Sequence, residues 1–189
     1  MKEAKPVLPD VTNETADVWL AAPTLDEIRD AANALKNVAF ETPLLENAEA
    51  NERLSGRLMV KAETSQRTGS FKFRGAYNRI RQMGDATRNR GVITYSSGNH
   101  GQAVAHVASM MDIKARIVMP DDAPANKVQR TRQLGAQITS YNRSIKTRED
   151  VAEQLRKEYN HVLVPPNEDR RVLAGTGTVA LELIRQAEA

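Results

Sequence analysis

Lys72 is the residue of this sequence whose type and surroundings most clearly indicate chemistry. The preceding residues 68–70, Thr-Gly-Ser, form a turn signal, and a helical pattern opens with Phe71 and Phe73 on either side of the lysine. Tyr77 continues the face of Phe73 at helical spacing, so Lys72 is expected beside buried surface in the first turn. A lysine there can attack a carbonyl carbon and form a Schiff base; a solvated lysine is the ordinary alternative.

Covalent catalysis requires the neutral amine of Lys72. A free lysine has a pKa of about 10.4, and lowering it by about 3 units takes about 4 kcal/mol of preference for the neutral form. Burial of the amine or a neighbouring cation would supply that preference. Arg67 and Arg74 lie close to Lys72 in the sequence and are the candidate cations.

A second group of residues, 96–101 (Ser-Ser-Gly-Asn-His-Gly), lies between an expected strand at 92–96 and an expected helix at 99–111. Ligands of open α/β sheets bind at the carboxyl ends of the strands. Backbone N–H groups and the dipole at the start of the helix would attract an anion there, and the small residues allow it to come close. An ordinary turn in which Asn99 caps the helix is the alternative interpretation.

Other kinds of site fit the sequence less well. Residues 69–72 do not have the spacing of a phosphate-binding P-loop. A dinucleotide site with Asp121 as its ribose-binding acid is disfavoured, because the turn at Gly98 lacks the three-glycine spacing. The three histidines have no metal-ligand spacing, so we expect no metal site and treat these residues as structural or substrate-facing.

Expected strands and helices alternate beyond Lys72, which favours an α/β fold with an open parallel sheet flanked by helices. Thr24 and Glu27 have the spacing of a capping box at the start of the first helix. The expected strands are 58–63, 92–96, 116–119, 137–141 and 161–164. The expected helices are 25–35, 48–54, one that opens at 71, 99–111, 124–134, 147–159 and 172–187.

Composition narrows the class of protein. The 189 residues are 40% hydrophobic and 27% charged, which is typical of a soluble globular protein. The net charge of +3 is mild and its signs are interspersed, so we expect no nucleic-acid partner, and we interpret the basic stretch 143–148 as a solvated loop. No apolar run is long enough to span a membrane, and we expect a cytoplasmic location. The absence of cysteine excludes disulfides and thiolate metal sites.

With both groups of residues in view, the chain resembles the fold type II pyridoxal phosphate enzymes, and within them the threonine dehydratase and serine racemase family. Residues 68–76 (TGSFKFRGA) are similar to the family's cofactor-lysine motif, and residues 96–103 (SSGNHGQA) are similar to its asparagine loop. Further similar stretches are 117–120, 123–124 together with 127–128, and 174–182. The resemblance extends from Thr24 to the end of the chain and implies a tryptophan synthase β-like architecture.

The resemblance implies a role for each matching residue. Lys72 would hold pyridoxal 5'-phosphate covalently and then move the α-proton of the bound amino acid. Asn99 would hydrogen-bond the 3-hydroxyl of the cofactor, Phe71 would line the ring pocket, and Ser97 would be a second acid/base on the opposite face. The substrate carboxylate would be held by Ser97, Gly98, Asn99 and His100.

The implied reaction is β-elimination on a hydroxy amino acid such as threonine or serine, which gives a 2-oxo acid and ammonia. Serine racemase-type activity is one alternative. A non-catalytic remnant that acts as an interaction module is the other.

The family's phosphate-binding glycine-rich loop follows the helix that begins near Thr178, and the residue facing the pyridine nitrogen comes later still. The sequence ends at Ala189, before either, so we expect a truncated form of the fold. Thr176 also replaces the glutamine that is more usual there.

The expected organisation has four parts. Residues 1–23 form an N-terminal arm, 24–84 the first part of a large cofactor domain, 85–165 a small α/β domain, and 166–189 an incomplete return to the large domain. Apolar faces at 58–60 and 179–184 should be partly uncovered. A homo-oligomer, or a second chain that supplies the missing half, is therefore the expected partner besides the small amino-acid substrate.

Overall fold

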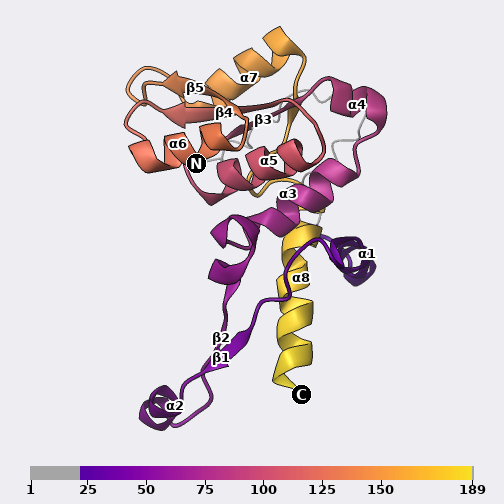
Figure 1. The fold of residues 1–189 in the computed structure, drawn as a ribbon, viewed down its shortest axis with the longest axis vertical. Coiled ribbons are helices and arrows are strands. Elements are labelled where there is room, and N and C mark those ends of the chain that lie inside the picture. The colour runs from indigo at the N-terminus through magenta and orange to yellow at the C-terminus, as the bar shows by residue number, and fades with distance from the viewer. Residues whose placement is uncertain (1–21, 189) are drawn as a thin grey trace, which may run out of the picture.

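The structure, a computed structural model, describes residues 22–188. The predicted arm, residues 1–23, lies outside the described residues except for its last two. A four-stranded sheet occupies one end of the molecule, and a layer of helices with a two-stranded ladder extends from it (Figure 1).

The four-stranded sheet is parallel throughout, as predicted. Its strands lie in the order β5 (Gln137–Tyr141), β4 (Ala115–Pro120), β3 (Val92–Tyr95) and β6 (Val162–Leu163). Strand β3 pairs with both β4 and β6 and is buried along its whole length. A strand covered on both faces is mainly apolar instead of alternating with polar residues, which is why the sequence pattern located it.

Three helices cover the two faces of this sheet. The core on one face joins Ile117 of β4 to residues of α5 (Asn99–Met110) and α6 (Ala125–Gln133). The core on the other face joins Ile93 of β3 and Val118 of β4 to α7 (Arg148–Tyr159), whose first turn Thr147 caps. We call β3–β6 with α5, α6 and α7 the sheet layer.

A second layer is built on α3 (Lys72–Arg81) and α8 (Arg170–Ala187), with α1 (Leu25–Leu35) against α8. The predicted capping box of Thr24 and Glu27 is present at the start of α1. Gly75 and Gly175 allow α3 and α8 to cross closely, because a Cβ at Gly75 would lie 2.7 Å from the Val172 carbonyl oxygen. The backbone carbonyl of Arg74 leaves equally little room at Gly175.

The predicted strand at 58–63 is shorter than expected and does not join the parallel sheet. It is β2 (Met59–Lys61), which pairs antiparallel with β1 (Leu44–Glu46). Helix α2 (Ala48–Leu54) connects the two strands, as Figure 1 shows at the lower end of the molecule. We call α1, α3, α8 and the β1–β2 ladder together the α3–α8 layer.

Short elements link the two layers. The turn before α3 is formed by two 3-10 helices, η2 (Glu63–Ser65) and η3 (Arg67–Gly69), and α4 (Asp85–Asn89) leads from α3 to β3. The sequence pattern predicted neither the 3-10 helices nor α4, since each is too short to display a hydrophobic period.

A buried ion-pair network joins α3 to its neighbours. The guanidinium of Arg74, whose side chain is 1% exposed, binds Glu63 at 2.8 Å and Glu182 of α8 at 2.6 Å. Lys61 of β2 binds the same Glu182 carboxylate at 2.8 Å. Sequence patterns gave no sign of this network, because its members are spread over more than a hundred residues.

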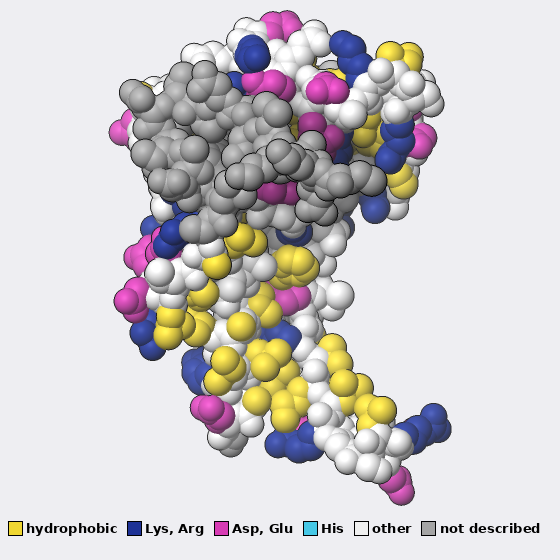
Figure 2. Space-filling model, turned by 180° about the vertical axis from the view of Figure 1, so that it is seen from behind, with side chains coloured by type: hydrophobic (Ala, Val, Ile, Leu, Met, Phe, Trp, Pro, Cys, Tyr) yellow, Lys and Arg dark blue, Asp and Glu magenta, His cyan; other side chains and the backbone are white. Residues whose placement is uncertain are grey.

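The apolar faces expected to be uncovered are exposed. Leu58, which precedes β2, is 45% exposed, Val60 of β2 is 52% exposed, and Ile184 of α8 is 52% exposed. Figure 2 shows hydrophobic side chains gathered on the half of the molecule where Figure 1 has α8, β1 and β2. In the part of the chain that the structure describes, no helix is both long and apolar enough to cross a membrane.

Candidate active site

Lys72 is the first residue of α3, and a tight turn sets its position. Thr68 and Gly69 both have left-handed backbones, with φ of 63° and 73°. Glycine adopts this conformation readily and threonine does not. Phe71 follows the turn, is 38% exposed, and lies with its ring centroid 5.3 Å from the Lys72 Nζ.

The Lys72 amine donates to two neutral oxygens. Its Nζ lies 2.8 Å from the Pro166 carbonyl oxygen and 2.7 Å from Asn167 Oδ1. Burial lowers the pKa of Lys72, and the charge of Glu168 opposes that effect. The environment therefore shifts the amine toward the neutral form that a nucleophile or a base requires.

The two arginines considered as causes of this shift are engaged elsewhere, so that hypothesis was wrong. Arg67 donates from Nε to the Val38 carbonyl oxygen at 2.6 Å and lies over the Phe40 ring. Arg74 is neutralised by its two carboxylate partners. Loss of solvation, not a neighbouring cation, lowers the pKa of Lys72.

The topology brings the second group of residues to the same place. Residues 96–99 follow β3, and residues 164–168 follow β6, which pairs with β3 in parallel. The carboxyl ends of the two strands therefore lie at one edge of the sheet, and Lys72 reaches that edge through Pro166. His100 joins the two loops, because its Nε2 lies 3.0 Å from the Val164 carbonyl oxygen.

The start of α5 has the features of an anion site. Gly98 is the N-cap residue, and no side chain caps the helix. The Gly98 N–H donates to Ser96 Oγ at 3.2 Å, which fixes the turn. Asn99 is the first helical residue and its side chain is exposed, so the alternative in which Asn99 caps the helix is wrong. Uncapped N–H groups and the helix dipole favour a bound carboxylate at this turn.

Several buried polar atoms near these turns have no partner among the described residues. They are Thr68 Oγ1, Ser70 Oγ, Thr94 Oγ1 and His100 Nδ1. Because His100 Nε2 faces a carbonyl oxygen, it carries the proton and Nδ1 is the acceptor. Burial is the main cause that lowers the pKa of His100 to about 4, and the charge of Lys72 contributes. Unpaired hydroxyls and an amine with a lowered pKa fit a polar cofactor beside Lys72.

The predicted site residues thus divide into two sets. Lys72 and Phe71 lie together at the start of α3, while Ser97, Gly98, Asn99 and His100 lie at the start of α5. No hydrogen bond joins Lys72 to the second set within residues 22–188. Sequence analysis missed Pro166 and Asn167, whose only signal was the Pro165-Pro166 pair after the last predicted strand.

Comparison with known proteins identifies the family. A model described as "Pyridoxal-phosphate dependent enzyme" matches residues 35–189. The chain belongs to the pyridoxal-phosphate dependent enzyme family. The resemblance to fold type II members, and the cofactor that it implies, are confirmed at this level.

Individual relatives give the same family and a range of activities. The chain is 43% identical over 167 residues to the L-threo-3-hydroxyaspartate ammonia-lyase of Saccharomyces cerevisiae, a match covering 88% of this chain and 51% of that one. It is 40% identical to the serine racemase of Schizosaccharomyces pombe, over 88% and 52% of the two chains.

The solved structure of maize serine racemase has a TM-score of 0.85 and 36% identity, and the match covers 89% of this chain and 51% of that one. The predicted tryptophan synthase β-like α/β architecture is therefore confirmed for the matched part. The chain spans about half the length of the curated relatives it matches.

Proposed function

We propose that this chain carries the lysine half of a pyridoxal phosphate site that catalyses β-elimination on a hydroxy amino acid, giving a 2-oxo acid and ammonia. One observation supports this most directly. The Lys72 amine is partly desolvated, has a lowered pKa, and is held by two neutral oxygens at the carboxyl edge of a parallel sheet. The ammonia-lyases among its relatives support the reaction class.

Each proposed residue has a distinct task. Bound pyridoxal phosphate would supply an electron sink for the negative charge that develops at the substrate Cα. Lys72 would hold the cofactor and then take the proton from Cα, for which its lowered pKa suits it. The uncapped start of α5, from Ser97 to His100, would bind the substrate carboxylate and orient the Cα–H bond. Asn99 would hydrogen-bond the 3-hydroxyl of the cofactor, and Phe71 would cover its ring.

Racemisation is the second candidate function. It requires a group that returns a proton to the face of Cα opposite Lys72, and Ser97 is the residue proposed for that task. The serine racemases among the relatives favour this alternative. An assay that measures D-serine and 2-oxo acid from the same L-serine sample separates the two reactions.

We propose that residues 85–165 form a small domain, and that 24–84 and 166–189 belong to a large domain preceded by an arm at 1–23. The exposed apolar face over Val60 and Ile184 supports a partner, either a second copy or a separate chain that completes the large domain. Light scattering at several protein concentrations tests for the second copy. The cytoplasmic location stays a prediction from the sequence.

Covalent labelling tests the proposal. The purified chain is incubated with pyridoxal phosphate and reduced with borohydride, and the modified peptide is identified by mass spectrometry. We expect labelling confined to Lys72, with loss of both the label and the visible absorption band in Lys72→Ala. Lys127→Ala, which removes an exposed lysine of α6, is the matched control and should label normally.

Scattered labelling of surface lysines, or none, would contradict a formed pocket in this chain and favour the non-catalytic interaction module. If Lys72 is labelled, threonine, serine and threo-3-hydroxyaspartate are then compared as substrates by the 2-oxo acid released. Labelling without product from any of them would retain the cofactor site and reject the elimination.

A further inference from the structure

A basic groove lies at the other end of the four-stranded sheet from Lys72. Its volume is about 550 Å³, and its lining comes from the amino ends of all four strands. Arg90 precedes β3, Lys114 precedes β4, Arg116 is the second residue of β4, and His161 precedes β6. Parallel strands place their amino ends at one edge, so residues from four distant stretches meet there.

The groove concentrates positive charge. Three of its nine lining residues are Arg90, Lys114 and Arg116, and none is an acid. Among the described residues, none of these three cations forms an ion pair with a carboxylate. Glu158 interacts with the Tyr159 hydroxyl without lining the groove. Like charges held together without counter-charges repel, and a bound anion would offset that repulsion.

Neutral contacts hold the cations in place. Arg116 donates to Gln137 Oε1 at 2.8 Å and Thr139 Oγ1 at 3.1 Å, and its guanidinium lies 4.1 Å from the centroid of the Tyr159 ring. Arg90 donates from Nε to the Asn160 carbonyl oxygen at 2.9 Å. These contacts fix the positions of the two guanidiniums without neutralising their positive charge. A preformed binding site for a phosphate or carboxylate group has this property.

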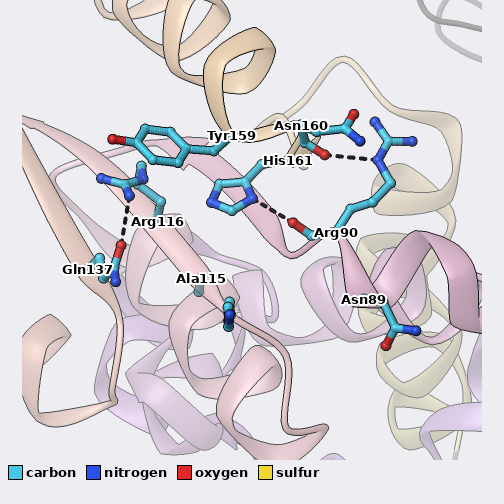
Figure 3. A pocket seen from close by; sticks show the side chains of 9 residues that line it. Asn89, Arg90, Ala115, Arg116, Gln137, Tyr159, Asn160 and His161 are labelled. Carbon is cyan, nitrogen blue, oxygen red and sulfur yellow. Dashed lines mark hydrogen bonds between the residues drawn. The ribbon is translucent and has the colours of Figure 1, made fainter.

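His161 lies between the two arginines, as Figure 3 shows. Its Nδ1 is 2.6 Å from the Arg90 carbonyl oxygen, and its ring stacks on Tyr159. Burial lowers the pKa of His161, and the charges of Arg116, Lys114 and Arg90 lower it further. The pKa of His161 therefore depends on the charge in the groove and should change when an anion binds there.

We propose that this groove is a second binding site, separate from the Lys72 site, for a small polyanion carrying phosphate or carboxylate groups. Cations spread along the edge of a sheet match a ligand with more than one charged group better than a single ion. The inference does not depend on the proposed enzymatic function, because none of its residues belongs to the Lys72 site.

Calorimetric titration of the 189-residue chain with inorganic pyrophosphate, and separately with citrate, tests the proposal. We expect Lys114→Gln to weaken binding of the preferred anion by about tenfold, since one charge-assisted contact is lost. Lys114 is exposed, so this variant should fold. Arg130→Gln on α6 makes the same change in net charge away from the groove and should alter affinity by less than about twofold. Tighter binding of pyrophosphate identifies a phosphate ligand, and tighter binding of citrate identifies a carboxylate ligand.

A second measurement follows the His161 ring by NMR. Sulfate, whose charge is constant over the range of the titration, should raise the pKa of His161 when it binds, and the rise should be smaller in Lys114→Gln. Equal affinity of the Lys114 and Arg130 variants would overturn the proposal and indicate only general charge screening. Absence of binding, or an unchanged His161 pKa with sulfate bound, would also overturn it.

Discussion

The sheet layer and the α3–α8 layer are held together by different forces. The sheet layer packs aliphatic side chains on both faces of β3 and β4, and Ile93, Ile117 and Val118 are fully buried. The α3–α8 layer instead buries charged groups between α3 and its neighbours. Arg74 is paired with Glu63 and Glu182, and Arg79 with Asp169 at 2.7 Å.

Apolar packing and buried ion pairs give the two layers different properties. Apolar packing stabilises in rough proportion to the area that it removes from water, and it tolerates rearrangement. A buried ion pair adds little net stability, but loss of one partner costs much, because a charge is left without compensation. The α3–α8 layer thereby fixes one arrangement of α3, and with it the position of Lys72.

Removal of Arg74 should give the largest effect. Arg74→Met leaves the Glu63 carboxylate without its cation and leaves Glu182 paired with Lys61 alone, and we expect a loss of about 3–5 kcal/mol in the free energy of unfolding. Arg53→Met, which breaks an exposed pair with Glu49, is the control and should cost less than about 1 kcal/mol. Urea unfolding measures both, and equal losses would remove the distinction between the two layers.

A cavity in the sheet layer should come next. Ile117→Ala removes a fully buried side chain from the core beneath α5, and we expect a loss of about 2–5 kcal/mol. The same substitution at Ile145, which is 76% exposed, should change stability by less than about 0.5 kcal/mol. A small effect at Ile117 in urea unfolding would mean that the sheet layer repacks freely.

Acid should weaken the two layers in different pH windows. His100 has a pKa of about 4 in the folded chain against 6.5, so the unfolded chain binds the proton more tightly between these values. The contribution of His100 to the free energy of unfolding, about 3 kcal/mol, is fully present above pH 6.5 and is lost as the pH falls to about 4. Burial opposes ionisation of Glu182, but hydrogen bonds from Arg74 and Lys61 lower its pKa below 4.5, so its contribution is lost only at lower pH.

Unfolding free energies measured from pH 8 to pH 3 check these windows. His100→Gln should flatten the curve between pH 6.5 and pH 4 and leave the steeper fall below it. Glu182→Gln should do the reverse. If the unfolding free energy of His100→Gln depends on pH as steeply as that of the unchanged chain, burial of this imidazole does not control the response to acid.

The smallest effect is expected on the uncovered face of the α3–α8 layer. Leu45 of β1 is 52% exposed, and Leu45→Ser should change the unfolding free energy by about 0.5 kcal/mol or less in dilute solution. Unfolding midpoints are compared at low and high protein concentration. A loss that grows with concentration would show that a second copy covers this face, and a large loss at every concentration would show that Leu45 is buried by its own chain.

Local sequence patterns predicted much of the fold. The mainly apolar strand at 92–95, the caps at Thr24 and Thr147, and the regular alternation of strands and helices follow from interactions within a few residues of one another. The turn before Lys72 and the small residues before α5 could also be predicted, because each is a short run of neighbouring residues. They also carried the resemblance that the family comparison confirmed.

Contacts between residues that are distant in the sequence could be identified only from the tertiary structure. The pairing of β2 with β1, the ion pairs of Arg74 and the meeting of Lys72 with Pro166 each depend on which surfaces face each other after the chain has folded. The cause of the lowered Lys72 pKa belongs to this class: the sequence offered neighbouring arginines, whereas burial in the folded chain produced the shift. The sequence by itself determined most of the strands and helices and the candidate lysine, because both depend on residues that are neighbours in the chain. Only the tertiary structure decided the partners of Lys72 and the direction of its pKa shift, because desolvation and long-range pairing exist only in the packed chain.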